Sequence, residues 1–378
     1  MFEWDTGCRE KEIVTQHSRK KKDNMADTLT MKAMGLTQKP KVGNIPSEIK
    51  ELIIQIPRIN DTEILVKIVS STLHPDDIAM AQGTAAGRFL GPKEISGEKP
   101  YIMGSNFSGV IEAIGNKVSQ FSIGDEVIGI PSKKGEHDSW ATYRCVDQKN
   151  IRIKPKALSH QEAASMITAG CVAYGMLLSS KVRKGDLCLI IGASGGIGSV
   201  ITQMLKSKGA IVTGLCSTRN IEMVKANGAD YVIDYTKDKY VEKLISQDKK
   251  MDLVFDLVGG KELENDSIKV LQKKGKFLTV CGPEKYIGSK KLSWGKVIGM
   301  MWHIIHRSLL SKLIRPTYIF SAQDPSTTID KMLDFVIKNN IKVPFDRIIP
   351  LQINELKEAL KHLAAHKTSG RIVIDVTN

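Results

Sequence analysis

A glycine-rich turn between an apolar segment and a helical pattern has residue types that bind phosphate. Residues 187–191 read LCLII, residues 192–198 read GASGGIG, and apolar residues then recur at helical spacing as far as Gly209. Glycines let a backbone approach a ligand closely, and the free N–H groups at the start of a helix attract anions. The pattern predicts a phosphate cradle for a dinucleotide, with a purely structural turn as the alternative. The residues expected to contact the phosphates are Ser194, Gly195, Gly196, Ile197 and Gly198.

The segment after this helix carries the residues that would distinguish NADPH from NADH. Proteins that bind NAD commonly place an Asp or Glu on the ribose 2′-hydroxyl about 20 residues beyond the turn. Here residues 211–216 read IVTGLC and are followed by Ser217, Thr218, Arg219 and Asn220, without an acid. The planar fork of an Arg suits a phosphate. The sequence therefore predicts NADPH, with Ser217 and Arg219 on the 2′-phosphate; the alternative is a solvent-facing Arg219.

Composition limits the class of protein. The 378 residues include 55 basic and 41 acidic side chains, which give a formal charge of +14. A chain of this length commonly folds as two domains, and no stretch approaches the ~18 uninterrupted apolar residues of a membrane-spanning helix. The charge favours anionic partners such as phosphate-bearing cofactors, acidic membranes or nucleic acid, and an ordinary basic surface is the alternative. The six cysteines form no C-x-x-C pair, which indicates reduced thiols in a cytoplasmic protein.

Periodicity indicates the elements that must position the turn. Residues 1–26 are polar and aperiodic, which predicts a disordered extension. Short strands broken by glycine over 31–161 favour a barrel-like domain. A helix over 161–178 precedes alternating strands and helices, in which Asn220 begins one helix, and this alternation favours a parallel sheet. Strands are expected at 187–191, 211–216, 231–234, 252–258 and 276–280, followed by helix 328–338, strand 343–351, helix 353–366 and strand 371–376.

Several short motifs follow one another in an order that resembles a known family. They are MGSNFSGV at 103–110, GDEV at 124–127, EAA at 162–164, ASGGIG at 193–198, GADYVIDY at 228–235, FDLVG at 255–259 and SGRIV at 369–373. Over residues 30–378 the chain resembles the medium-chain dehydrogenase/reductase superfamily, and within it the zinc-independent quinone oxidoreductase branch.

The resemblance implies an α/β fold in which a Rossmann doubly wound parallel sheet is inserted in a β-rich, barrel-like catalytic domain. The catalytic domain would comprise residues 27–163 and 331–378, and the dinucleotide domain residues 164–330. The active site would lie between the two domains. The resemblance also assigns further cofactor contacts to Thr168, Val258, Gly259 and Gly282 near the nicotinamide ribose, Tyr235 at the adenosine end and Arg371 at the pyrophosphate.

Zinc-dependent relatives hold their metal with a Cys, a Gly-His-Glu motif and a later Cys or Asp. Here the middle motif reads Gly104-Ser105-Asn106, and no Cys occurs near Ser70-Ser71-Thr72. A catalytic zinc needs three protein ligands of the N, S or O type. We therefore expect no metal site, and the remaining candidates, His74 and His137, are lone histidines that are commonly structural.

Zinc-free relatives transfer a hydride from NADPH to a quinone or to an α,β-unsaturated carbonyl compound. The family often places Asn-Pro-x-Asp in the loop that faces the nicotinamide, and this chain has His74-Pro75-Asp76-Asp77. His74 could donate a hydrogen bond to the substrate carbonyl, which makes it the candidate catalytic residue, or it could only shape the loop. Asp77 is expected to cap the following helix.

A second class of function stays open, in which the chain binds NADPH with little catalysis and acts through its basic surface on a membrane or RNA. Residues 283–316 mix apolar and basic residues and do not fit the alternation of strands and helices. This insert could wall the substrate pocket, form a subunit interface or lie weakly on an anionic membrane. The expected partners are a small-molecule quinone or enone and a second copy of the chain, with no DNA.

Overall fold

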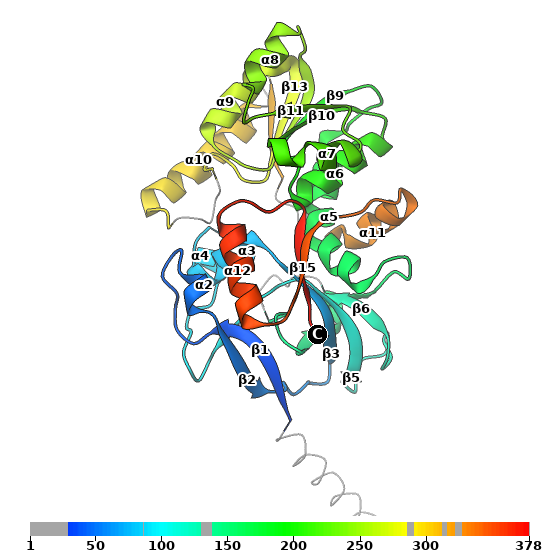
Figure 1. The fold of residues 1–378 in the computed structure, drawn as a ribbon. Coiled ribbons are helices and arrows are strands. Elements are labelled where there is room, and N and C mark those ends of the chain that lie inside the picture. The colour runs from blue at the N-terminus through cyan, green and yellow to red at the C-terminus, as the bar shows by residue number, and fades with distance from the viewer. Residues whose placement is uncertain are drawn as a thin grey trace, which may run out of the picture.

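The computed structural model describes residues 29–85, 87–129, 138–285, 291–311, 316–321 and 327–377, which fold into two domains side by side (Figure 1). The predicted disordered extension at 1–26 and His137 lie outside the described residues. Both domains match the predicted fold class, an α/β protein with a parallel Rossmann-like sheet and a separate β-rich part, which is therefore confirmed.

The dinucleotide domain contains one parallel six-stranded sheet. Its strand order is β11-β10-β9-β12-β13-β14. The chain builds the sheet from β9 toward one edge and then continues from β12 on the other side of β9, and ligands bind at such a switch point in open α/β sheets. The central strands β9, β10 and β12 are largely apolar because both faces of the sheet are covered. The strands are β9 (Leu187–Ile191), β10 (Ile211–Cys216), β11 (Tyr231–Asp234), β12 (Met251–Asp256), β13 (Leu271–Thr279) and β14 (Thr317–Phe320).

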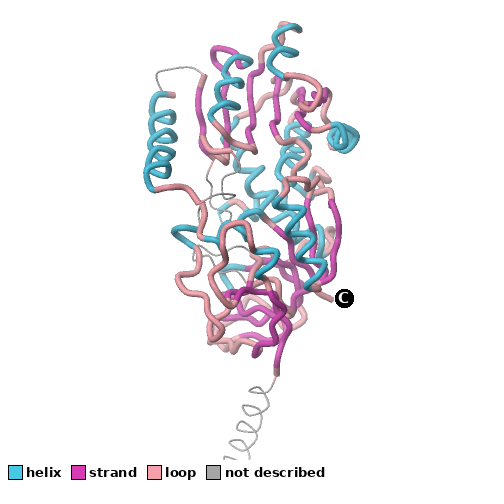
Figure 2. The backbone as a smooth tube through the Cα atoms, turned by 60° about the vertical axis from the view of Figure 1, so that its left-hand side comes forward, coloured by secondary structure: helices cyan, strands magenta, loops and turns pink. Residues whose placement is uncertain are grey.

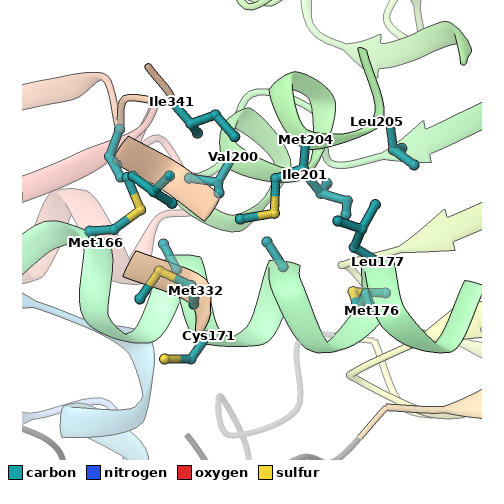
Figure 3. Packing of buried hydrophobic residues seen from close by; sticks show 14 of the residues in the cluster. Met166, Cys171, Met176, Leu177, Val200, Ile201, Met204, Leu205, Met332 and Ile341 are labelled. Atoms are coloured by element: carbon teal, nitrogen blue, oxygen red, sulfur yellow. The ribbon is translucent and has the colours of Figure 1, made fainter. Parts of the chain in front are cut away.

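Helices cover the two faces of this sheet. The main hydrophobic core lies where the long helix α5 packs on α6, and Figure 3 shows Val200 and Met204 of α6 above α5, which carries Met166 and Met176. α5 is also the one described helix long and apolar enough to cross a membrane, and 78% of that stretch is buried inside the fold. The helices are α5 (His160–Ser180), α6 (Gly196–Ser207), α7 (Ile221–Ala226), α8 (Tyr240–Ser246), α9 (Lys261–Val270), α10 (Trp294–Leu310) and α11 (Ile329–Lys338), with the 3₁₀ helix η2 at Thr218–Asn220.

The β-rich domain contains a seven-stranded and a three-stranded sheet. In the larger one, strands from both ends of the chain are neighbours, since β16 pairs antiparallel with β3 through Ile372 and Leu73. The larger sheet comprises β3 (Glu63–Leu73), β5 (Phe107–Ile114), β6 (Glu126–Gly129), β7 (Tyr143–Asp147), β8 (Ile151–Ile153), β15 (Phe345–Pro350) and β16 (Arg371–Asp375). The smaller sheet comprises β1 (Thr30–Leu36), β2 (Lys50–Gln55) and β4 (Tyr101–Ile102).

Short helices close the β-rich domain at its edges. α12 packs on α2 and on β15, and its buried leucines complete a second core with strands β1 and β16. The helices are α2 (Ile45–Glu48), α3 (Pro75–Gln82), α4 (Gly87–Leu90), η1 (Gln148–Asn150) and α12 (Ile353–Ala364).

The segment 283–316 was the part of the chain that the strand–helix alternation could not place. The structure shows that it continues the alternation, because α10 is followed by β14, the sixth parallel strand, which pairs with β13. α10 lies at the periphery of the dinucleotide domain in both views (Figures 1 and 2).

Candidate functional site

The glycine turn connects the end of β9 to the start of α6 and has the shape of a close-packed cradle. A side chain at Gly198 would place its Cβ 2.1 Å from the carbonyl oxygen of Gly192, so the helix start lies directly on the strand end. Gly195 occupies the N-cap position of α6 with an extended backbone, and no side chain caps the helix there. The first N–H groups of α6 therefore keep their capacity to bind an anion.

Arg371, at the first position of β16, brings a buried positive charge to this turn. Its side chain is 6% exposed, and its Nε lies 2.5 Å from where a Cβ on Gly196 would stand. Neither Nε nor Nη2 has a hydrogen-bond partner among the described residues. Burial lowers the pKa of Arg371 to about 10, and the carboxylates of Asp76 and Asp77 act in the opposite direction.

A buried guanidinium without a partner is unfavourable unless an anion neutralises it. The predicted pyrophosphate of a dinucleotide supplies such an anion, and Arg donates two parallel hydrogen bonds to phosphate oxygens. The geometry at Arg371 and the cradle at Gly198 thus both fit the predicted cofactor.

Asn220 follows β10 and links three segments. The prediction that it begins a helix is confirmed, since it is the N-cap residue of α7, but its side chain makes no capping bond there. Its Nδ2 donates to Ser194 Oγ at 3.0 Å, and its Oδ1 accepts from Ser369 Oγ at 2.7 Å. Asn220 therefore ties the glycine turn to the C-terminal loop, a contact that a local sequence pattern does not contain. Ser217 lies within this network, with its Oγ 3.4 Å from Asn220 Nδ2.

Arg219 lies exposed beside the same loop. Its Nη2 donates to the carbonyl oxygen of Lys367 at 2.5 Å, which ties the guanidinium to the loop before β16. Tyr235 follows β11, is 58% exposed and is held by its backbone N–H, which donates to the Cys216 carbonyl. The residues predicted for the adenosine end therefore lie at the carboxyl ends of neighbouring strands.

The residues predicted for the nicotinamide end lie at the ends of β12 and β13. Buried Asp256 accepts hydrogen bonds from the N–H groups of Val258 and Gly259, and burial raises the pKa of its carboxyl. Val258 packs against Gly192 of the turn, and Gly282 follows β13 with its N–H donating to Thr279. These bonds orient the two loops toward the cradle.

Thr168, in the middle of α5, is hydrogen-bonded to a residue of the β-rich domain. Its Oγ1 donates to Asn106 Oδ1 at 2.9 Å, and Asn106 Nδ2 lies 3.4 Å from Thr72 Oγ1. Asn106 and Ser71 belong to the two segments that the resemblance matched with zinc-ligand motifs, and here Ser71 Oγ donates to the Asn106 carbonyl. Hydroxyl and amide groups thus satisfy one another in that region. Within the described parts of the chain, no three His, Cys, Asp or Glu side chains gather in a metal-binding group.

His74 caps α3 and has one ring nitrogen fixed. Its Nδ1 accepts the backbone N–H of Asp76 at 3.1 Å, so in the neutral ring the proton is on Nε2. The backbone N–H of His74 in turn donates to Asp77 Oδ2 at 2.8 Å, which is the helix cap that we expected from Asp77. Burial raises the pKa of the Cys281 thiol, beside Gly282, and the charges of Asp256 and Asp76 add to this effect. Asp76 also opposes the lowering of the Arg371 pKa by burial.

Comparison with known proteins matches this architecture over most of the chain. Residues 60–180 match the family model of the alcohol dehydrogenase GroES-like domain, and residues 227–374 match that of zinc-binding dehydrogenases. A zinc-type alcohol dehydrogenase-like protein of Schizosaccharomyces pombe is 28% identical over 82% of this chain and 86% of its own length. The NADPH-dependent alkenal/one oxidoreductase of Arabidopsis thaliana chloroplasts is 25% identical over 85% of this chain and 74% of its own length.

A solved structure agrees with these matches. The quinone oxidoreductase from Coxiella burnetii superposes with a TM-score of 0.72 at 26% identity, over 92% of this chain and all of the other. The chain belongs to the medium-chain dehydrogenase/reductase superfamily of oxidoreductases, in its quinone oxidoreductase-like branch.

Proposed function

We propose that this protein is an NADPH-dependent reductase of quinones or α,β-unsaturated carbonyl compounds that works without zinc. The observation that carries the proposal is the buried, unpartnered guanidinium of Arg371 beside the glycine turn, which requires an anion such as the pyrophosphate of a dinucleotide. The names of the Arabidopsis and Coxiella relatives support the substrate classes, and the absence of an acid after β10 supports NADPH.

In the proposed mechanism, the nicotinamide supplies the hydride, and the protein supplies binding, orientation and a hydrogen-bond donor. The turn and Arg371 would hold the pyrophosphate. Val258 and Gly282 would contact the nicotinamide end of the cofactor. His74, with its proton on Nε2 when neutral, would donate a hydrogen bond to the substrate oxygen that gains negative charge in the reduction.

The zinc-free part of the proposal rests on the hydrogen bonds at the position where relatives hold the metal. Ser71, Thr72 and Asn106 bond to one another there, and none of them is a common zinc ligand. Dialysis against a strong chelator is expected to leave turnover unchanged. Loss of turnover on chelation with recovery on adding Zn²⁺ would overturn this part.

The function is tested by NADPH oxidation, followed at 340 nm, against a small panel of ortho-quinones and enones. Turnover with members of the panel supports the reductase. Tight NADPH binding with no turnover on a broad panel supports instead the second candidate, a cofactor-binding protein that acts through its basic surface.

We propose the cytoplasm as the location of the protein. The proposal is supported by the free cysteines among the described residues, which are Cys145, Cys171, Cys188, Cys216 and Cys281. Cell fractionation tests it.

Arg219→Ala is expected to weaken NADPH binding about tenfold and to leave NADH binding unchanged, because only NADPH presents a 2′-phosphate to the guanidinium. The measurement is a fluorescence titration of the wild type and the variant with both cofactors. Arg183→Ala, an exposed arginine before β9, is the matched control. Equal affinity of the wild type for NADH and NADPH would contradict the role of Arg219.

His74→Ala is expected to lower kcat about a hundredfold while the NADPH Kd stays nearly constant, because it removes the donor to the substrate oxygen. The same change removes the cap of α3 and costs about 1 kcal/mol of stability. His74→Asp separates the two effects, since an ionised carboxylate can cap the helix but cannot donate. If His74 only shapes the loop, the Ala variant will lose thermal stability without losing kcat, and the Asp variant will keep the kcat of the wild type.

A further inference from the structure

α10 presents a row of large apolar side chains to solvent. Val297 is its one buried residue, although Trp, Ile, Leu and Met make up much of the helix. Soluble proteins rarely expose a contiguous apolar face of this kind without a partner. The exposed fractions lie between 50% and 67% for Trp294, Ile298, Met301, Trp302, Ile305 and Leu309.

The opposite side of α10 is firmly attached to the dinucleotide domain, so the orientation of the exposed face is fixed. Buried Glu264 of α9 lies 2.8 Å from His303 Nε2 and accepts from Arg307 Nε at 2.7 Å. The Arg307 guanidinium also lies over the ring of Tyr318 in β14. Ile304 contacts Gly282, at the predicted nicotinamide end.

The exposed face continues onto the β-rich domain. The ring of Phe89 in α4 is 62% exposed and lies 6.1 Å from that of Trp294, in an edge arrangement. The Arg88 guanidinium lies 4.6 Å above Trp294 and donates to the carbonyl of Leu292. The apolar face of α10 together with Phe89, here called the α10 face, therefore spans both domains.

The α10 segment itself carries charge of only one sign. Residues 291–311 contain no Asp or Glu, and Lys291 and Lys296 are both exposed at its N-terminal end. Trp, Ile and Leu on one side with lysines beside them are typical of helices that lie in the surface of an anionic membrane. The net charge of +14 on the whole chain adds attraction to such a surface.

A second copy of the chain fits this face less well. A twofold interface brings the same patch of two subunits together, so each α10 face would meet a face of the same positive charge with no acid between residues 291 and 311 to pair with it. We propose that the α10 face docks the protein on an anionic lipid membrane, with the apolar side chains among the headgroups and Lys291 and Lys296 on the lipid phosphates.

Vesicle co-sedimentation tests the proposal with the full-length protein. Phosphatidylcholine vesicles with and without phosphatidylglycerol are compared, at low and high salt. We expect binding to the anionic vesicles that weakens as salt screens the charges. The double variant Ile298→Glu/Trp302→Glu is expected to bind at least about tenfold more weakly, because two apolar side chains no longer enter the headgroup region. Ile53→Glu on β2, where the side chain is 66% exposed, is the matched control and should bind like the wild type.

Two outcomes would overturn the proposal. One is no co-sedimentation of the wild type with anionic vesicles. The other is equal binding by the double variant and the wild type. If the wild type does not bind vesicles, and analytical ultracentrifugation finds a dimer for the wild type but a monomer for the double variant, the α10 face joins two copies instead. Sedimentation needs no turnover, so these results stand apart from the proposed enzymatic activity.

Discussion

Arg371→Met should make the cofactor-free protein more stable and weaken NADPH binding about a hundredfold. Burial lowers the pKa of this guanidinium from 12.5 to about 10, which corresponds to about 3 kcal/mol of unfavourable free energy for the charged form in the folded state. Because the folded pKa lies below the unfolded one, this cost is fully present at neutral pH, begins to fall as the pH rises through about 10, and is gone only above the unfolded pKa of 12.5. Met fills similar space without charge, so the free protein gains stability while the phosphates lose a charged donor.

Thermal unfolding with and without NADPH measures both effects in one experiment. The variant should unfold at a higher temperature than the wild type without cofactor, and added NADPH should raise its Tm much less, since stabilisation follows the ratio of ligand concentration to Kd. Arg183→Met, at the other end of β9, should leave both values unchanged. A lower Tm of the free variant would show that the guanidinium is satisfied in the folded protein, and an unchanged NADPH Kd would remove Arg371 from the site.

Two alanine substitutions in the glycine turn should affect different properties, one mainly NADPH binding and the other mainly stability. Gly195→Ala is expected to fold normally, because its backbone is extended and the nearest atom to a new Cβ, the Gly192 oxygen, is 3.5 Å away. It should nevertheless weaken NADPH binding at least about tenfold, because a methyl group would stand where the backbone approaches the pyrophosphate. Gly198→Ala, whose Cβ would lie 2.1 Å from the same oxygen, should lose about 3 kcal/mol of stability.

Urea unfolding gives the stabilities of these two variants, and fluorescence titration gives their NADPH affinities. A structural turn with no ligand predicts another result for Gly195→Ala, namely wild-type affinity together with wild-type stability. Normal stability of Gly198→Ala would mean that β9 and α6 can move apart, which contradicts the close packing at Gly192.

The elements that sequence patterns located well are those fixed by local interactions. Strands 187–191, 211–216 and 231–234 match the structure residue for residue, because an apolar run bounded by glycine or polar residues suits a buried parallel strand and little else. The order of the short motifs along the chain indicated the family, and the resemblance to that family predicted the two-domain architecture. β13, which begins at Leu271, was less well located, because Gln272, Lys273 and Lys274 are polar and its length comes from pairing with β12.

The parts that the sequence could not provide depend on contacts between distant segments. Asn220 has the residue type of a helix cap, and only the fold brings Ser369 close enough to bind its amide instead. The sequence likewise did not determine which side of α10 packs on the dinucleotide domain, because large apolar residues occur all around this helix. The structure shows Ile304 facing the domain and Trp302 facing solvent.

The pairing of β16 with β3 also has a consequence for the order in which the protein becomes functional during synthesis. β3 leaves the ribosome before the dinucleotide domain, and β16, which carries Arg371, leaves after it. The glycine turn can fold early from local contacts, but the edge of β3 must wait for a strand from the far side of an entire domain. A nascent chain will therefore have a folded Rossmann sheet before it can bind its cofactor tightly, and during that interval the open edge of β3 is the segment most in need of a chaperone.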